Sequence, residues 1–519
     1  MLFTEKTLHT LEYDKIIAML ADCCSTEGAK ARALSLMPTD DYDTVLKRQT
    51  RTDDAKRLIG AKGYPPFSAP ESVIPSAERA YKGAILSPRE LLDIASLLRS
   101  AKAVSDYIGE DKLFDTSLDE IFARVMPRAD LESRITRSII SEDLIADEAS
   151  PTLADIRRRI RNANNKIKDT LQSYIGGARL KYLQENIVTM RNGRYVVPVK
   201  AEYRNEMKGL VHDTSSSGAT LFVEPIAVVD ANNELKTLTA EEEHEIERIL
   251  ASLSAECAEA STIISLDYRN ITELAFYFGA ATLAMQMKAS EPHLAVGAEI
   301  ELKRARHPLI PSEKVVPIDV SVGKEFSTLI ITGPNTGGKT VTLKTLGLFA
   351  LMVQSGLQIP ASEESTVGIF SEVLVDIGDE QSIEASLSTF SSHMVNVVGI
   401  ISAMTDKSLV LFDELGSGTD PIEGAALAIS ILERTKSVGA VTAATTHYAE
   451  LKAYALDTPG VQNASCEFDI ESLRPTYRLI VGTPGKSNAF AISEKLGMDE
   501  EIIKRAESLI NRRISGLSQ

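Results

Sequence analysis

Eight consecutive residues of this chain have the types and the order that bind a phosphate chain: Gly333, Pro334, Asn335, Thr336, Gly337, Gly338, Lys339 and Thr340. A predicted strand at 326–332 precedes them, and a segment with a helical pattern follows at 341–354. The glycines let successive backbone N–H groups point at phosphate oxygens, and the helix N-terminus adds partial positive charge. Lys339 would reach the β- and γ-phosphates, and the Thr340 hydroxyl would ligate Mg²⁺. The motif therefore predicts binding of a nucleoside triphosphate.

A second predicted strand, at 408–412, ends in the acidic pair Asp413 and Glu414. A carboxylate at a strand tip beside a phosphate loop can hold the Mg²⁺ shell, and we assign that role to Asp413. Glu414 is then placed to orient or deprotonate the attacking water. The pair predicts that a bound triphosphate is hydrolysed.

Further polar landmarks follow in a fixed order. The segment 386–393 is rich in Ser and Thr and lies where a helix is predicted to begin. Their hydroxyl groups could cap the helix N-terminus or bind an anion. A glycine-rich turn at 416–421 comes directly after the acidic pair. Another predicted strand, at 438–445, closes in Thr446 and His447, which brings an imidazole to the edge of the site. Each feature alone is compatible with an ordinary cap or a loop histidine, so their joint order carries the argument.

The series GPNTGGKT, DEQSIEASLSTFSSH, LVLFDELGSGTDP and TTHY resembles the ATPase domain of the MutS family, within the ABC-type ATPases. Two departures separate it from the mismatch-repair members. Their loop reads Met-x-Gly-Lys-Ser-Thr where this chain has TGGKTV, and they carry Arg-Gly-Thr-Ser where this chain has SGTDP. Both variants are typical of the bacterial MutS-two branch, and the resemblance runs along essentially all 519 residues.

The resemblance implies a composite site in a homodimer, with ATP and Mg²⁺ as cofactors. In ABC-type ATPases two nucleotides lie between two protomers, and a signature segment of each protomer faces the γ-phosphate bound by the other. By similarity, Ser388 and Thr389 would act in trans, and Asp420 would lie across the dimer seam. His447 would contact the γ-phosphate or its water, which completes a catalytic set with Glu414 and Lys339.

Charge is unevenly distributed along the chain. The net charge is −17 and the pI about 5.1, yet residues 151–210 contain 13 Lys and Arg against 5 Asp and Glu, a local excess of about +8. Such a cluster could neutralise the phosphates of a nucleic acid, or could simply be a solvated face. We expect Arg191, Arg194, Lys200 and Arg204 to touch a nucleic-acid backbone.

The predicted fold class is multidomain, α plus α/β. A helical core of short amphipathic helices covers 1–125. Long lever helices with a small inserted β clamp, at about 181–226, cover 126–290. A MutS-type ABC ATPase domain with a P-loop and a central, mostly parallel sheet covers 291–519. Lever helices of about 35 residues would be roughly 50 Å long at about 1.5 Å per residue.

Several classes are disfavoured by the sequence. The four cysteines have no zinc spacing, the first residues lack signal-peptide character, and no uncharged apolar run is long enough to span a membrane, so we expect a cytoplasmic protein without a membrane partner. By the resemblance, we expect the chain to lack the mismatch-reading domain of the family. MutS-two proteins continue into a coiled coil and a small nuclease (Smr) domain, so endonuclease activity is expected only in a longer chain that carries it.

The sequence thus predicts a dimeric ATP-hydrolysing clamp that acts on nucleic acid. The family offers two targets: branched DNA, in suppression of homologous recombination, and stalled or collided ribosomes with their rRNA, which the clamp would split. A structural dimerisation ATPase similar to cohesin, in which ATP gates assembly, is the alternative. A transporter subunit is disfavoured because the segment Leu-Ser-Gly-Gly-Gln is missing.

Overall fold

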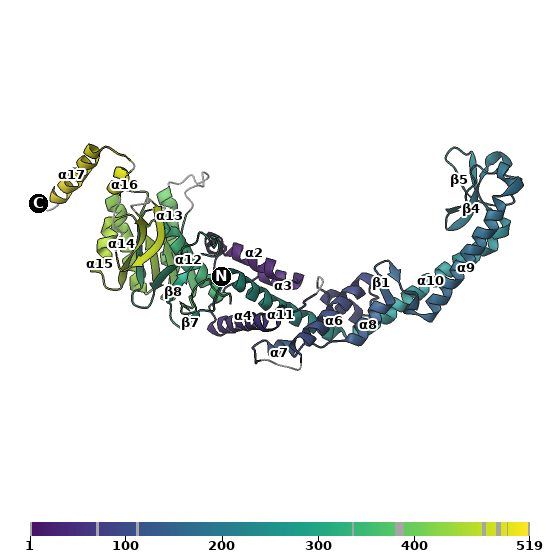
Figure 1. The fold of residues 1–519 in the computed structure, drawn as a ribbon, viewed down its shortest axis with the longest axis horizontal. Coiled ribbons are helices and arrows are strands. Elements are labelled where there is room, and N and C mark those ends of the chain that lie inside the picture. The colour runs from purple at the N-terminus through teal and green to yellow at the C-terminus, as the bar shows by residue number, and fades with distance from the viewer. Residues whose placement is uncertain are drawn as a thin grey trace. The chain divides into compact units, whose positions relative to one another are not determined.

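The structure, a computed structural model, describes residues 3–68, 72–109, 114–334, 337–378, 389–469, 474–483, 489–495 and 497–516. The chain forms two compact units (Figure 1). The first unit consists of Met1–Pro65, Leu113–Glu120 and Glu273–Gln519, and the second of Pro66–Lys112 and Ile121–Thr272. The N-terminal helices therefore belong to the same unit as the phosphate-loop segment.

A six-stranded sheet in the order β12-β13-β14-β10-β15-β16 forms the centre of the first unit. Neighbouring strands are parallel except β16, which runs antiparallel to β15. Each of β10, β13 and β14 has five residues, and all of them are buried, as expected for parallel strands covered on both faces. The strands are β10 (Thr328–Thr332), β12 (Glu372–Asp376), β13 (Ser408–Phe412), β14 (Val441–Thr445), β15 (Val461–Asp469) and β16 (Arg474–Val481).

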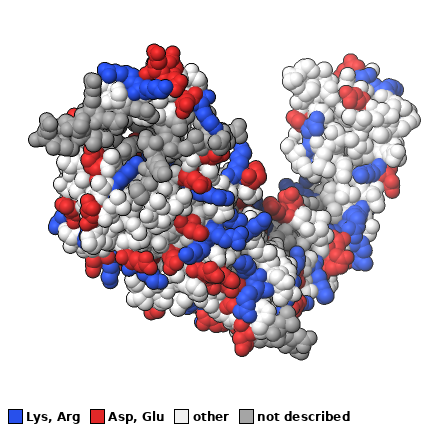
Figure 2. Space-filling view, turned by 60° about the vertical axis from the view of Figure 1, so that its left-hand side comes forward, with Lys and Arg blue, Asp and Glu red and all other residues white. Residues whose placement is uncertain are grey.

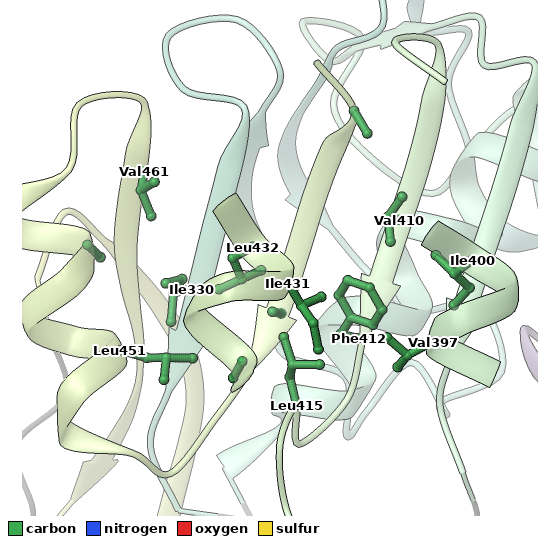
Figure 3. Close-up of a cluster of buried hydrophobic side chains, with 14 of the residues drawn as sticks. Ile330, Val397, Ile400, Val410, Phe412, Leu415, Ile431, Leu432, Leu451 and Val461 are labelled. Carbon is green, nitrogen blue, oxygen red and sulfur yellow. The ribbon is translucent and has the colours of Figure 1, made fainter. Parts of the chain in front are cut away.

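Helices cover both faces of this sheet, because successive strand residues point to opposite sides. They are α12 (Lys339–Gln354), α13 (Thr389–Ala403), α14 (Pro421–Val438) and α15 (Ala449–Asp457). The chain then continues into α16 (Ala489–Lys495) and α17 (Glu500–Gly516). On one face, Phe412 of β13 lies between Ile431 of α14 and Val397 of α13 in a buried cluster (Figure 3). On the other face α12 packs so closely that a Cβ at Gly347 would lie 2.7 Å from side-chain atoms of both Leu11 and Leu411.

Four helices precede this domain in the chain and pack in the same unit: α1 (Glu5–Thr10), α2 (Tyr13–Cys23), α3 (Glu27–Leu34) and α4 (Tyr42–Lys62). A second, four-stranded sheet in the order β7-β11-β8-β9 also belongs to the unit. Its strands are β7 (His293–Ala295), β8 (Ile300–Ala305), β9 (Ile318–Val322) and β11 (Thr366–Gly368).

The second unit is mostly helical, with a two-stranded hairpin and a small four-stranded sheet. Its helices are α5 (Ile74–Tyr81), α6 (Pro88–Ile108), α8 (Ala129–Ser138), α9 (Pro151–Tyr174) and α10 (Ile226–Glu259), while α7 (Asp119–Phe122) and α11 (Ser261–Met287) cross from one unit to the other. A hairpin joins β1 (Ile139–Ser141) to β2 (Leu144–Ile145). The antiparallel sheet β3-β4-β6-β5 consists of β3 (Thr189–Arg191), β4 (Arg194–Lys200), β5 (Gly209–Thr214) and β6 (Thr220–Pro225).

The small sheet is inserted in the chain between α9 and α10, which pack side by side (Figure 1). Val197 and Val223 of the sheet pack against Leu171 of α9 and Leu235 of α10, and each of these side chains is at most 7% exposed. An ion pair of 2.6 Å between Arg157 Nε and Glu242 Oε1 joins the two helices further along. The sheet and the two helices therefore share one core.

The predicted fold class is confirmed, but two details were wrong. The first lever segment is interrupted: β1, β2 and the start of a new helix at Pro151, capped by Ser150, leave α9 with 24 residues against 34 in α10. At about 1.5 Å per residue these helices are about 36 and 51 Å long. The helices before residue 125 are also not all short, since α4 and α6 have 21 residues each. The predicted domain boundaries at 125 and 290 remain a proposal, because residues 1–65 belong to the same compact unit as the ATPase segment.

No single helix in the described part of the chain is both long and apolar enough to cross a membrane. Among those residues, only the bent pair α10 and α11 has sufficient length and apolar composition when taken together.

Candidate functional site

The predicted phosphate loop joins β10 to α12 at the carboxyl end of the parallel strands. Gly333 and Gly338 have φ angles of 133° and 93°, which L side chains rarely adopt. A Cβ added at Gly337 would lie 3.1 Å from Cys466 Cβ of β15, so the strand behind the loop leaves little space for a side chain there. Asn335 and Thr336 lie outside the described residues. The described glycines thus permit a tight turn directly before the N-terminus of α12.

Lys339, the first residue of α12, points back over this turn. Its side chain is almost fully buried, with 2% of the residue exposed, and Nζ donates a hydrogen bond of 3.0 Å to Gly333 O. Nζ also lies 3.2 Å from His447 Nε2. Burial lowers the pKa of Lys339, and the negative charges of Glu414 and Asp413 oppose that shift. A buried ammonium group at a helix N-terminus is a suitable partner for phosphate oxygens.

Asp413 lies at the tip of β13 and meets the loop through Thr340. The Thr340 hydroxyl donates a 2.7 Å hydrogen bond to Asp413 Oδ2, and Thr445 Oγ1 donates to Oδ1 at 2.5 Å. Hydroxyl and carboxylate oxygens in contact are the kind of ligands that Mg²⁺ takes in phosphate sites. The residues present therefore fit both a phosphate chain and its metal ion.

Glu414 and His447 form the next layer of the site. Glu414 has a φ angle of 49°, and its N–H donates a 2.8 Å hydrogen bond to Thr445 Oγ1, which holds this unusual backbone conformation. Glu414 Oε1 lies 3.0 Å from His447 Nε2. The two side chains are 28% and 45% exposed, so water can reach the carboxylate. The arrangement suits a base that acts on water and is oriented by an imidazole.

Two features of the site were missed by the sequence analysis. Thr445 holds both acidic residues through one hydroxyl, and its only sequence signal was its place at the end of a predicted strand. A cavity of about 500 Å³ adjoins the loop and is lined by apolar side chains that include Val315, Val316 and Val341 together with Tyr477. Cavities of roughly 300–1,000 Å³ accommodate small organic groups.

The residues expected to act across a dimer seam are only partly described. Ser388 lies outside the described residues, as does the side chain of Thr389, the first residue of α13. Asp420 caps α14, because its Oδ1 accepts hydrogen bonds from Ile422 N at 3.0 Å and Glu423 N at 3.2 Å. Asp420 therefore has a structural role in its own chain, whatever it contacts in a second one.

The four predicted clamp residues lie on the small sheet and its loops, in different environments. Arg194 donates to both carboxylate oxygens of Glu224, at 2.7 and 3.0 Å, and Glu224 is fully buried. The Arg191 side chain is 39% exposed against 18% for Arg194. Lys200 donates to a backbone carbonyl at 3.4 Å, and Arg204 to two, at 3.3 and 3.1 Å. On the face drawn in Figure 2, Lys and Arg are interspersed with Asp and Glu among uncharged side chains.

Comparison with known proteins identifies relatives of this chain. The family model described as MutS domain V matches residues 329–513. Over 512 residues the chain is 50% identical to a protein named endonuclease MutS2 from Acetivibrio thermocellus and 52% identical to one from Caldanaerobacter subterraneus subsp. tengcongensis. These alignments cover 98% of this chain and 65% and 64% of the relatives, so the chain spans about two thirds of their length. Similarity of this degree shows that the chain belongs to the MutS family and resembles its MutS2-type members.

Proposed function

We propose that this chain binds ATP with Mg²⁺ and hydrolyses ATP to ADP and phosphate. The observation that carries the proposal is the 2.7 Å hydrogen bond between Thr340 and Asp413, which lie 73 residues apart. It joins the loop that fits phosphate to the carboxylate that fits Mg²⁺, beside a buried lysine. The matched family domain supports the same activity.

Each residue has a part in this reaction. Lys339 and the N-terminal N–H groups of α12 bind phosphate oxygens, and Thr340 and Asp413 would hold the metal ion, which neutralises charge on those oxygens when bound. Glu414 accepts a proton from the attacking water, and His447 keeps that carboxylate in place. The apolar cavity lined by Val315 and Tyr477 is the proposed space for the nucleobase.

Two substitutions in the site test the proposal. Glu414→Gln should keep ATP binding and slow turnover by about 10²–10⁴. Lys339→Ala should lose nucleotide affinity, because a cation that faces phosphate is removed. Lys344→Ala is the matched control, since Lys344 lies on the same helix but pairs with Glu12 at 3.2 Å. Nucleotide titration and steady-state phosphate release measure both quantities, and undiminished turnover in Glu414→Gln would remove Glu414 from catalysis.

The resemblance further supports a homodimer that closes around two nucleotides. Ser388, Thr389 and Asp420 of one protomer would complete the site of the other. Mixing Lys339→Ala protomers with protomers that carry Ser388→Ala and Thr389→Ala should then restore one working site per dimer. Light scattering with ATP and Mg²⁺ measures assembly. Monomers under these conditions, with no recovery of activity on mixing, would contradict the dimer.

The proposed macromolecular partner is a nucleic acid, either branched DNA or the rRNA of a ribosome. The support is the local excess of about +8 between residues 151 and 210, together with the exposed Arg191. Titration of both targets over a salt series should give a slope set by phosphate contacts. Assembly with ATP but no binding to either target would favour the cohesin-like alternative.

We place the protein in the cytoplasm, which fits the four free cysteines of the chain. The relatives are named endonucleases. We propose endonuclease activity only for a chain that carries a further nuclease domain.

A further inference from the structure

One buried carboxylate joins β12 to α13. Asp376, the last residue of β12, is 5% exposed. Its Oδ2 lies 3.0 Å from His393 Nδ1, and its Oδ1 accepts a 2.9 Å hydrogen bond from Asn396 Nδ2. His393 and Asn396 are three residues apart on α13 and therefore lie on the same side of that helix. Both oxygens of Asp376 are thus used to hold α13.

The backbone of the same residue holds the proposed metal ligand. Asp376 lies opposite Phe412 in the parallel pairing of β12 with β13. The next residue along β13, Asp413, donates its backbone N–H to Asp376 O at 2.8 Å. Asp376 therefore contacts α13 through its side chain and the strand tip of the site through its main chain.

The contact with Asp376 favours the protonated form of His393. Accepting a hydrogen bond from the imidazole, the Asp376 carboxylate raises the pKa of His393, although burial of the imidazole opposes that shift. A buried carboxylate is tolerated when it is paired and hydrogen-bonded, so Asp376 favours one position of α13 over others. Loss of the charged partner should shift the helix or the strand tip.

We propose that Asp376 is a positioning residue that couples α13 to Asp413 through its contact with His393. The proposal rests on the proposed ATPase function. The helix α13 begins directly after Ser388, which the resemblance assigns to the site of the other protomer. A displacement at the start of α13 is thereby transmitted to the metal-binding carboxylate, and the coupling acts in both directions.

Two single variants and their combination test this coupling in the present chain. Asp376→Asn keeps an oxygen for Asn396 but removes the charge that faces His393, and His393→Gln removes the imidazole. Each should lower kcat about tenfold, while the KM for ATP stays within about twofold, because the phosphate loop is unchanged. The double variant should be no slower than the slower single variant, since both changes remove one interaction.

A control separates positioning from general stability. Glu273→Gln weakens another ion pair of the same unit, in which Glu273 lies 2.7 Å from the buried Arg51, and should lower the unfolding midpoint without changing kcat. A parent chain that does not hydrolyse ATP would overturn the proposed function itself. If the parent is active, then unchanged kcat in Asp376→Asn and His393→Gln, additive losses in the double variant, or a change confined to KM would each overturn the positioning role.

Discussion

Removal of Arg194 should destabilise the second unit rather than only weaken nucleic-acid binding. Glu224 is fully buried, and Arg194 Nη1 donates to both of its oxygens at 2.7 and 3.0 Å. Breaking a buried ion pair from one side costs about 3–5 kcal/mol, because the remaining charge stays buried. Asn232 still donates to Glu224 at 2.8 Å, and His212 Nε2 lies 2.5 Å away. We therefore expect Arg194→Ala to lower the free energy of unfolding by about 3 kcal/mol, the lower end of that range.

Arg191 provides the contrasting substitution on the same sheet. Its Nε lies 3.4 Å from Asp213 Oδ2, with the side chains 39% and 49% exposed, and its guanidinium lies 4.2 Å from the centre of the Phe222 ring. An exposed pair contributes about 0–1 kcal/mol and an exposed cation–π contact about 0.5–1 kcal/mol. Arg191→Ala should thus cost at most about 2 kcal/mol. If Arg191 contacts phosphate, the log–log salt slope should fall by about 0.7–0.9.

Two measurements separate these roles. The chain has no Trp, so unfolding by urea is followed by far-ultraviolet circular dichroism. Binding of branched DNA and of ribosomal particles is titrated over a salt series. The double variant Arg194→Met with Glu224→Gln should recover most of the lost stability, because no unpaired charge remains. Parental stability in Arg194→Ala, together with a reduced salt slope, would refute the assignment of Arg194 as an internal partner.

Three further outcomes follow from local geometry. Gly347→Ala should lose about 1–3 kcal/mol in urea unfolding, because the new methyl group meets Leu11 and Leu411 at 2.7 Å; parental stability would contradict this packing. Asp420→Ala should destabilise α14 by about 0.5–2 kcal/mol, whereas Asp420→Ser should keep the cap; equal losses would contradict a capping role. Burial raises the pKa of Asp267 to about 6, so its ionisation costs stability above pH 6 and that cost disappears below about pH 4. Relative to the parent, the free energy of unfolding of Asp267→Asn should therefore rise by about 1–3 kcal/mol as the pH increases from 4 to 7. A difference in stability that does not change with pH would contradict the raised pKa.

The phosphate loop and the acidic strand tip could be predicted because their chemistry is local. Glycine, lysine and threonine at fixed spacing after a strand specify both the backbone conformation and the groups it presents. The strand before Asp413 was predicted at its observed bounds, since a short apolar run that ends in charge has few alternative structures. Thr340 and Asp413 were each assigned to Mg²⁺ from their local context, and the structure brings their side chains within hydrogen-bond distance at the carboxyl ends of the parallel strands.

Features made by residues distant in sequence could not be predicted in the same way. The sequence shows the positive charge of Arg194, but its partner Glu224 lies 30 residues away on another strand. An arginine in a buried ion pair cannot be distinguished by sequence alone from one that contacts phosphate. The cavity beside the loop combines Val315, Val341 and Tyr477 from three separate segments. The interruption before α9 depended on a hairpin and a cap at Ser150 within an otherwise helical pattern.

The N-terminal helices are distant from the ATPase segment in sequence but belong to the same compact unit. The last carbonyl groups of a helix have no partners within it and need donors from elsewhere. For α12 some of these donors come from the N-terminal segment: Gln49 Nε2 donates to Val353 O at 3.2 Å, and Thr39 N donates to Gln354 O at 3.1 Å. The helix that carries Lys339 at its first turn is therefore held at its last turn by residues more than 300 positions earlier. A movement of α12 would therefore also change its contacts with the N-terminal segment.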